Sequence, residues 1–402
     1  MSATESGKMI GRMSVRRQLE STPSDPYPVP EASGTYVVNS SVINALPITG
    51  TKVLRALHYG ESLWGMAAKI ITQLPGGATE NYFLKVVTLG EIGRRMCEGE
   101  FESLKAIYTV SPGSVPKEFR DIKAQPADPV KPATLLAELH QGSTSPTGKF
   151  GFHISTCHAR IPQAVNSWEE SWCTLFSKHL RQVMDLARPI LQRPEFGIVC
   201  KLTLEKVVPR LLLPLQSEGR VLKSSLLHGD CWDGNTAIDM NTGEAFVFDV
   251  CSLYGHNEYD TGNWRAPRHR LSKQAYIETY EKYVPASKPA EDWDARNAIY
   301  IPGSSQRQVV YDDMTTLCRM FCPNDLQQEL IALRISQNKA SHLTNSIVAS
   351  GDGEEIEGEE GENEEEEEEE MEGKGARAKF ESGEKQNDRG PAVDPSAFIL
   401  LE

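Results

Sequence analysis

Short apolar runs separated by polar and glycine-containing turns fill the segment from Val53 to Val87. An apolar run that starts at Val53 leads into a glycine-containing turn at 58–65. The runs at 67–71 and 82–86 that follow have the length of strands. Strands joined by such short connections pair with their neighbours in the chain. We therefore predict a small antiparallel sheet here.

A helical spacing of apolar residues follows the sheet. Between Arg94 and Tyr108 the apolar residues include Met96, Phe101 and Ile107, with acidic residues among them. The same period recurs at 135–140, 168–191 and 275–283. These patterns predict an α+β protein of two lobes, the first a small sheet with one helix and the second mainly helical.

Two short apolar runs in the second lobe lead into polar side chains that suit phosphoryl transfer. The run 225–227 precedes Asp230 and Asn235, and the run 245–248 precedes Asp249. An Asp beside a reacting hydroxyl can accept its proton, while an Asn and a second Asp can hold the Mg²⁺ that bridges ATP phosphates. The alternative is an ordinary turn, because Gly, Asp and Asn favour turns.

Lys85 lies within an apolar strand, where an unpaired ammonium group is costly to bury. Glu100 on the following helix is the expected partner, and such a pair positions a cation against the ATP phosphates in kinases. The alternative is an edge-strand lysine beside a solvated helix face. Gly60 and Gly65 flank a turn whose N–H groups could cover phosphates, although a plain hairpin turn has the same pattern.

Charge is distributed very unevenly along the 402 residues. Fifteen acidic residues and no Lys or Arg lie between Asp352 and Glu372, and removing them from the formal net charge of −14 leaves +1 for the rest. This composition predicts a tail that does not fold. We expect a flexible leader at 1–39, a first lobe at 40–120, a helical lobe at 121–346 and the acidic tail at 347–402.

Eight scattered cysteines without CxxC spacing indicate reduced thiols, and the polar segment up to Tyr27 lacks the apolar core of a secretory signal. We therefore expect a cytoplasmic protein. We expect neither a nucleic-acid nor a membrane partner. The acidic tail is interpreted as a solubilising extension, or alternatively as a contact for basic proteins.

Several motifs together resemble those of the fructosamine and ketosamine 3-kinases, the protein-ribulosamine 3-kinases, over about 40–313. The stretch Asn263–Arg270 is similar to that of the fungal-type branch. The other elements that carry the resemblance are Glu98–Glu100, Leu136–His140, Gly148–His153, His228–Asn235, Phe248–Asp249 and Tyr254–Asp260.

The resemblance implies a bilobal protein-kinase-like, aminoglycoside-phosphotransferase-like fold that transfers the ATP γ-phosphate to the 3-hydroxyl of ketosamines. It gives Asp230 the role of base, Asn235 and Asp249 the role of Mg²⁺ ligands, and Lys85 with Glu100 the role of positioning phosphates. Trp232 is similar to the ring that packs on the sugar, a role that suits an indole; the alternative is a wedge in the loop. The implied partners are glycated proteins or free ketosamines.

The chain departs from the family pattern after the first helix. The segment 111–132 has no apolar run and contains five prolines, where a kinase-like lobe has two more strands and the adenine hinge. A second shortening falls between Tyr300 and Ile301. The strand of Lys85 is therefore expected to present an unpaired edge. Either the deletions are real or the gene model is incomplete.

Three functional hypotheses remain open from the sequence. The first is a ketosamine kinase. The second is a kinase for another small hydroxylated substrate. The third is a catalytically impaired kinase-fold binding protein.

Overall fold

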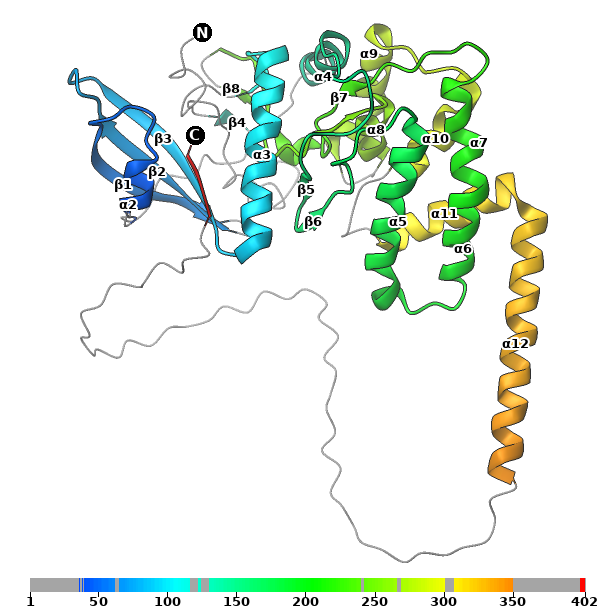
Figure 1. The fold of residues 1–402 in the computed structure, drawn as a ribbon. Coiled ribbons are helices and arrows are strands. Elements are labelled where there is room, and N and C mark those ends of the chain that lie inside the picture. Colours follow the sequence, from blue (N-terminus) through cyan, green and yellow to red (C-terminus); the bar gives the residue numbers. More distant parts are fainter. Residues whose placement is uncertain are drawn as a thin grey trace, which may run out of the picture. The chain divides into compact units, whose positions relative to one another are not determined.

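A computed structural model describes residues 36, 38, 40–61, 65–115, 122–123, 130–239, 242–265, 269–300, 307–349 and 398–401 (Figure 1). The chain divides into two compact units, Met1–Leu330 with Asp394–Glu402, and Ile331–Val393. Within the second unit, the described residues form the end of helix α12 (Pro323–Ala349). The acidic run, nearly all of the predicted leader, and the segment after Tyr300 lie outside the described residues.

The first lobe contains the antiparallel sheet that the sequence predicts. Strands β1 (Lys52–Glu61), β2 (Gly65–Gln73) and β3 (Thr79–Val87) pair in chain order. On β3, Tyr82, Leu84 and Val86 pack with the short helix α2 (Ser40–Asn44) in one apolar cluster. Side chains alternate between the two faces of a strand, so Lys85 lies on the face opposite that cluster.

The predicted open edge of β3 is occupied, and that expectation was wrong. Strand β11 (Phe398–Leu401), red in Figure 1, pairs antiparallel with β3. In this pairing Leu400 stands opposite Lys85. The sheet order is therefore β1-β2-β3-β11. The unpaired N–H and C=O groups of an edge strand readily accept another strand, and here the partner comes from the same chain.

Helix α3 (Gly90–Val110) follows β3, as the apolar spacing predicts. Its Met96 and Cys97 pack on Val87 of the sheet. Further along the helix, Leu104 and Ile107 join the main apolar core of the second lobe. The helix thus connects the sheet to the helical lobe and fixes the place of Glu100 between them.

No described residue between α3 and α4 (Val130–Gly142) pairs with β3. The next strand, β4 (Ile122–Lys123), instead pairs with β8 (Thr236–Asp239), which also pairs with β9 (Ala245–Val247). Residues 116–121 and 124–129 lie outside the described residues, so the predicted shortening of the first lobe stays a prediction.

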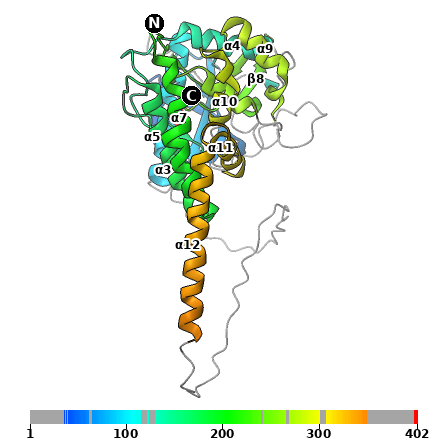
Figure 2. The same ribbon diagram turned by 90° about the vertical axis from the view of Figure 1, so that its right-hand side faces the viewer.

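The second lobe is mainly helical, as predicted. Its helix α5 (Trp172–Leu191) contacts α7 (Val208–Leu212) and α11 (Arg307–Phe321), and α11 runs across the direction of α5 (Figure 1 and Figure 2). Trp172 and Tyr300 are buried in this lobe, and the indole N–H of Trp172 donates a hydrogen bond to the phenol oxygen of Tyr300 at 2.8 Å. No described helix is long and apolar enough to cross a membrane. The helices are α4 (Val130–Gly142), α5 (Trp172–Leu191), α6 (Phe196–Leu202), a π-helical turn (Thr203–Val207), α7 (Val208–Leu212), α8 (Glu258–Gly262), α9 (Gln274–Tyr283), α10 (Trp293–Ile299), α11 (Arg307–Phe321) and α12.

Candidate active site

A two-strand ladder holds the loop that carries Asp230. Strand β7 (Ser225–Leu226) pairs with β10 (Tyr254–Gly255), and the Cys251 N–H extends the ladder by donating to the His228 carbonyl at 2.9 Å. Gly229 follows with φ of +86°, and a Cβ there would collide with the Cys251 carbonyl. Glycine is required at this turn for both reasons.

The buried carboxylate of Asp260 fixes the same turn. It accepts the backbone N–H groups of His228 and Gly229, each at 2.8 Å, and lies 3.0 Å from Nε2 of His140. Our sequence analysis gave Asp260 no role of its own. Asp260 belongs to α8, so its two hydrogen bonds attach the loop that carries Asp230 to this helix.

Asp230 lies at the centre of several polar side chains. Its Oδ2 accepts the amide of Asn235 at 3.0 Å, and its Oδ1 accepts the amide of Asn263 at 3.1 Å. Nε2 of His158 also lies 3.1 Å from Oδ1. Asn263 and His158 were not among the predicted site residues, because they come from segments remote in sequence.

His228 supports this loop as a neutral side chain. Burial lowers the pKa of its imidazole, and its Nδ1 accepts the Asp230 N–H at 3.1 Å. That geometry makes His228 a structural hydrogen-bonding group rather than a second base.

Two buried oxygen atoms face no hydrogen-bond donor, and they belong to the two predicted metal ligands. They are Oδ1 of Asn235 and Oδ2 of Asp249. The Asn235 amide reaches the Asp249 carbonyl at 3.5 Å, so the two residues are neighbours, and Asp249 has an uncommon φ of +54°. Oxygen ligands of this kind fit Mg²⁺, which usually takes one or two protein groups plus phosphates and water. Among the described residues, no three or more His, Cys, Asp or Glu side chains cluster as a complete metal site.

Lys85 is buried between two carboxylates. Its ammonium group forms an ion pair with Glu100 and lies 3.4 Å from Oδ1 of Asp249. Burial alone lowers the pKa of Lys85, but the attraction of Glu100 and Asp249 outweighs it and raises that pKa above its ordinary value. Burial raises the pKa of Glu100 to about 7, and attraction to Lys85 offsets only part of this effect. The predicted Lys85–Glu100 pair is present.

The two predicted phosphate-covering glycines lie on the first hairpin. Gly60 is in β1 opposite Ala67, and Gly65 begins β2 with its Cα against the backbone of Val86. The turn between them, 62–64, lies outside the described residues. A phosphate-binding role for these glycines stays a prediction.

Trp232 is half-buried beside Asp230 in the same loop. Its ring centroid lies 4.9 Å from that of His269, and its ring fills the space in which a side chain at Gly234 would stand. These contacts fit the loop-wedge alternative. Contact with a sugar stays a prediction.

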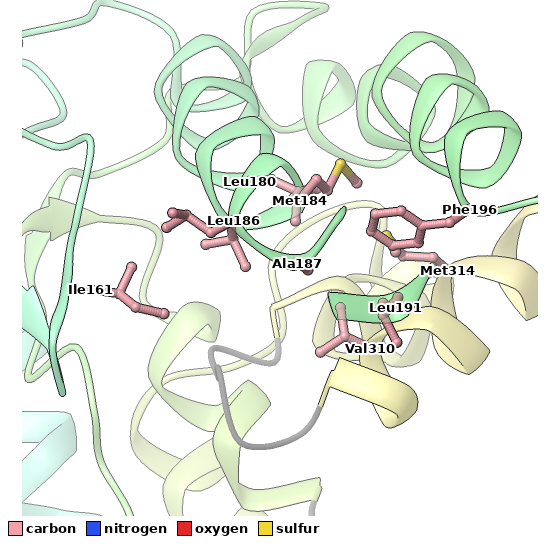
Figure 3. A pocket seen from close by; sticks show the side chains of 10 residues that line it. Ile161, Leu180, Met184, Leu186, Ala187, Leu191, Phe196, Val310 and Met314 are labelled. Atoms are coloured by element: carbon pink, nitrogen blue, oxygen red, sulfur yellow. The ribbon is translucent and has the colours of Figure 1, made fainter. Parts of the chain in front are cut away.

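An apolar pocket elsewhere in the second lobe shares no residue with this polar site. Figure 3 shows Leu180 and Met184 of α5 facing Phe196 and Met314, with Ile161 at one end. Its lining carries no group that could accept a proton or hold phosphate. Of these two regions, only the polar cluster around Asp230 and Asp249 carries groups that could accept a proton or hold a metal ion.

The sequence of residues 65–301, more than half of the chain, matches the family model described as fructosamine kinase. The chain belongs to the fructosamine kinase family. A chloroplastic protein-ribulosamine 3-kinase of rice (Oryza sativa subsp. japonica) is 34% identical over 204 residues, which are 46% of this chain and 56% of that protein. A ketosamine-3-kinase of mouse (Mus musculus) is 29% identical over 217 residues, covering 44% of this chain and 67% of that protein.

Structural comparison supports the same family fold. The crystal structure of a candidate fructosamine-3-kinase from Thermobifida fusca YX-ER1 superposes with a TM-score of 0.52 at 19% identity, covering 70% of this chain and 100% of that one. The predicted α+β kinase-like fold is therefore confirmed. The chain spans a little over half the length of the rice relative.

Proposed function

We propose that this family member is an ATP-dependent kinase that phosphorylates the 3-hydroxyl of ketosamines, either free or on glycated proteins. The observation that carries the proposal is the Asp230 carboxylate, which accepts hydrogen bonds at both oxygens, beside the side-chain oxygens of Asn235 and Asp249 that have no hydrogen-bond donor. The names of the rice and mouse relatives supply the acceptor class.

Each polar group has a distinct task in this reaction. The acceptor O–H bond breaks as its oxygen bonds to the γ-phosphorus, ADP leaves, and the proton passes to the Asp230 carboxylate. Lys85, held by Glu100, neutralises phosphate charge, and Asn263 and Asn235 keep the base in place. Asn235 and Asp249 would hold Mg²⁺, which supplies further neutralisation of phosphate charge when bound.

Phosphate transfer from γ-labelled ATP to a ribulosamine, with magnesium present, tests the proposal. We expect ketosamine-dependent ADP release that falls at least about 100-fold in Asp230→Asn, which keeps the shape of the side chain and removes its basicity. Choline serves as the control acceptor. Equal turnover of choline and ketosamine would instead support the kinase for another small hydroxylated substrate.

An impaired kinase is the second candidate, and the sheet order favours it. β3 pairs with β11, and the described residues that follow α3 pair with β8 instead. The family's adenine hinge would have followed in that position, so we propose weakened ATP binding. Micromolar affinity in an ATP titration would contradict this candidate.

We also propose a reducing, cytoplasmic location. All eight cysteines are free, and seven of them are buried. Unpaired thiols are typical of proteins kept reduced inside cells. Fractionation of cells that express a tagged protein would test the location, with a chloroplast or other organelle as the contrary result.

A further inference from the structure

A short hairpin brings His158 to the candidate base. Strand β5 (Cys157–His158) pairs with β6 (Ile161–Pro162), and a two-residue turn joins them. Ala159, the first residue of this turn, has φ of +52°, a conformation that residues with a Cβ rarely adopt. The imidazole Nε2 lies 3.1 Å from Oδ1 of Asp230, which is an ion-pair distance when the ring is protonated, although the ring is not oriented to donate a hydrogen bond to that oxygen.

The hairpin is anchored to the segment that directly follows Asp249. Gln163 at its far end donates its side-chain N–H to the Cys251 carbonyl at 3.1 Å. Thr156 at its near end donates its hydroxyl to the Ser252 carbonyl at 3.3 Å. Both ends of the hairpin therefore attach within three residues of Asp249.

The hairpin is also packed against the helix that carries Glu100. Gly99 of α3 lies so close to it that a Cβ on Gly99 would stand 3.0 Å from the Thr156 Cα. The same short hairpin thus contacts the residue beside Glu100, the residues after Asp249, and Asp230 itself. An imidazole mounted in this way has little freedom to move.

His158 and Asn263 reach the same oxygen of the base from different elements. Asn263, at the end of α8, donates to Oδ1 at 3.1 Å, while Asn235 donates to Oδ2 at 3.0 Å. A carboxylate held at both oxygens cannot rotate about its Cβ–Cγ bond without losing these contacts. Rotation would misplace the base relative to the acceptor hydroxyl, and misplacement by about 1 Å can reduce a rate about 100-fold.

We propose that His158 is a positioning residue for phosphoryl transfer, which together with Asn263 fixes Oδ1 of Asp230 in its productive orientation. The inference rests on the proposed kinase function. His158 acts through Asp230 and needs no contact with ATP. Its loss should therefore change kcat and leave the KM for ATP nearly unaltered.

His158→Ala, His158→Gln, Asn263→Ala and the Ala–Ala double variant test the proposal in the full chain. We expect His158→Ala to lower kcat about 10- to 100-fold. Glutamine places an N–H near the position of Nε2, so His158→Gln should recover most of the rate. Because both residues hold one oxygen, the double variant should lose less than the product of the single losses.

Ala159→Gly is the matched control, since it alters the same turn without touching the imidazole. It should keep the wild-type kcat. Wild-type kcat in His158→Ala would overturn the proposal. Equal losses in His158→Ala and His158→Gln, with lowered melting temperatures, would also overturn it by assigning the ring a packing role.

A spectroscopic measurement separates failure of this proposal from failure of the proposed function. With ¹⁵N-labelled histidine, the ring resonances of His158 should move in Asp230→Asn, whether or not the protein phosphorylates a ketosamine. Unchanged resonances would overturn the proposed positioning. An inactive wild-type chain with shifted resonances would overturn the ketosamine kinase function and leave the positioning contact supported.

Discussion

Asp260 accepts the backbone N–H of Gly229 at 2.8 Å and thereby holds the turn that presents Asp230. The same carboxylate accepts the His228 N–H at 2.8 Å. Two adjacent backbone donors on one buried carboxylate form a rigid support, because hydrogen bonds to a charged group are stronger than neutral ones.

We expect Asp260→Asn to disturb this support. Asparagine offers one acceptor oxygen and turns an N–H₂ group toward a backbone donor, so one N–H of the turn loses its partner. The free energy of unfolding should fall by about 2–3 kcal/mol, and kcat should fall with it. Urea unfolding and steady-state kinetics would measure both, and wild-type values in both would contradict the assigned support.

Gly229→Ala should be far more damaging than alanine at an open glycine. The matched control is Gly219→Ala, because Gly219 has a similar φ of +78° and nothing within 4 Å of an added Cβ. The control should cost about 1–2 kcal/mol for the backbone conformation alone. Gly229→Ala adds a collision with the Cys251 carbonyl, so its cost should exceed the control by about 1–3 kcal/mol. Equal costs in thermal unfolding would rule out the collision.

The raised pKa of Glu100 makes stability depend on pH in a defined direction. An acid whose pKa is about 7 in the folded protein and 4.5 when unfolded binds more protons in the folded state between these values. Its contribution to stability is full below about pH 4.5 and is lost as pH rises to about 7, with a slope of at most about 1.4 kcal/mol per pH unit. Glu100→Gln should remove this slope from a series of urea unfolding curves. Identical slopes in both proteins would contradict the assignment.

Removing residues 398–402 should destabilise the first lobe by re-exposing the edge of β3. Loss of the β11 pairing should cost about 2 kcal/mol or more and promote aggregation. The control is deletion of 352–372, which removes the acidic run and keeps β11; a shorter connection changes loop entropy only slightly. Thermal unfolding and light scattering would compare them. Equal behaviour of the two deletions would mean that β11 contributes nothing to the sheet.

Local pattern in the sequence predicted much of the fold and half of the site. Short apolar runs between turns located β2 and β3, helical spacing located α3, and the cost of burying Lys85 led to its pairing with Glu100. Each of these features depends on residues that are close in sequence. The partner of the buried Lys85, for example, lies on the helix that directly follows its strand.

The missed contacts all join distant segments. Asn263 reaches Asp230 across 33 positions, and His140 reaches Asp260 across 120. No periodicity in the sequence marks such pairs. A visible signal was the apolar run 398–401 after a long polar stretch, which would have suggested a strand for the open edge.

The pairing of β3 with β11 also has a consequence for synthesis of the protein. The strand that bears Lys85 leaves the ribosome roughly 300 residues before its neighbour, which at about 5–20 residues per second is a delay of about 15–60 seconds. Throughout that time the helical lobe can fold while the edge beside Lys85 stays open. A chaperone that binds extended chains could bind the open edge during this interval. A ribosome stalled before residue 398 would carry a first lobe without its last strand.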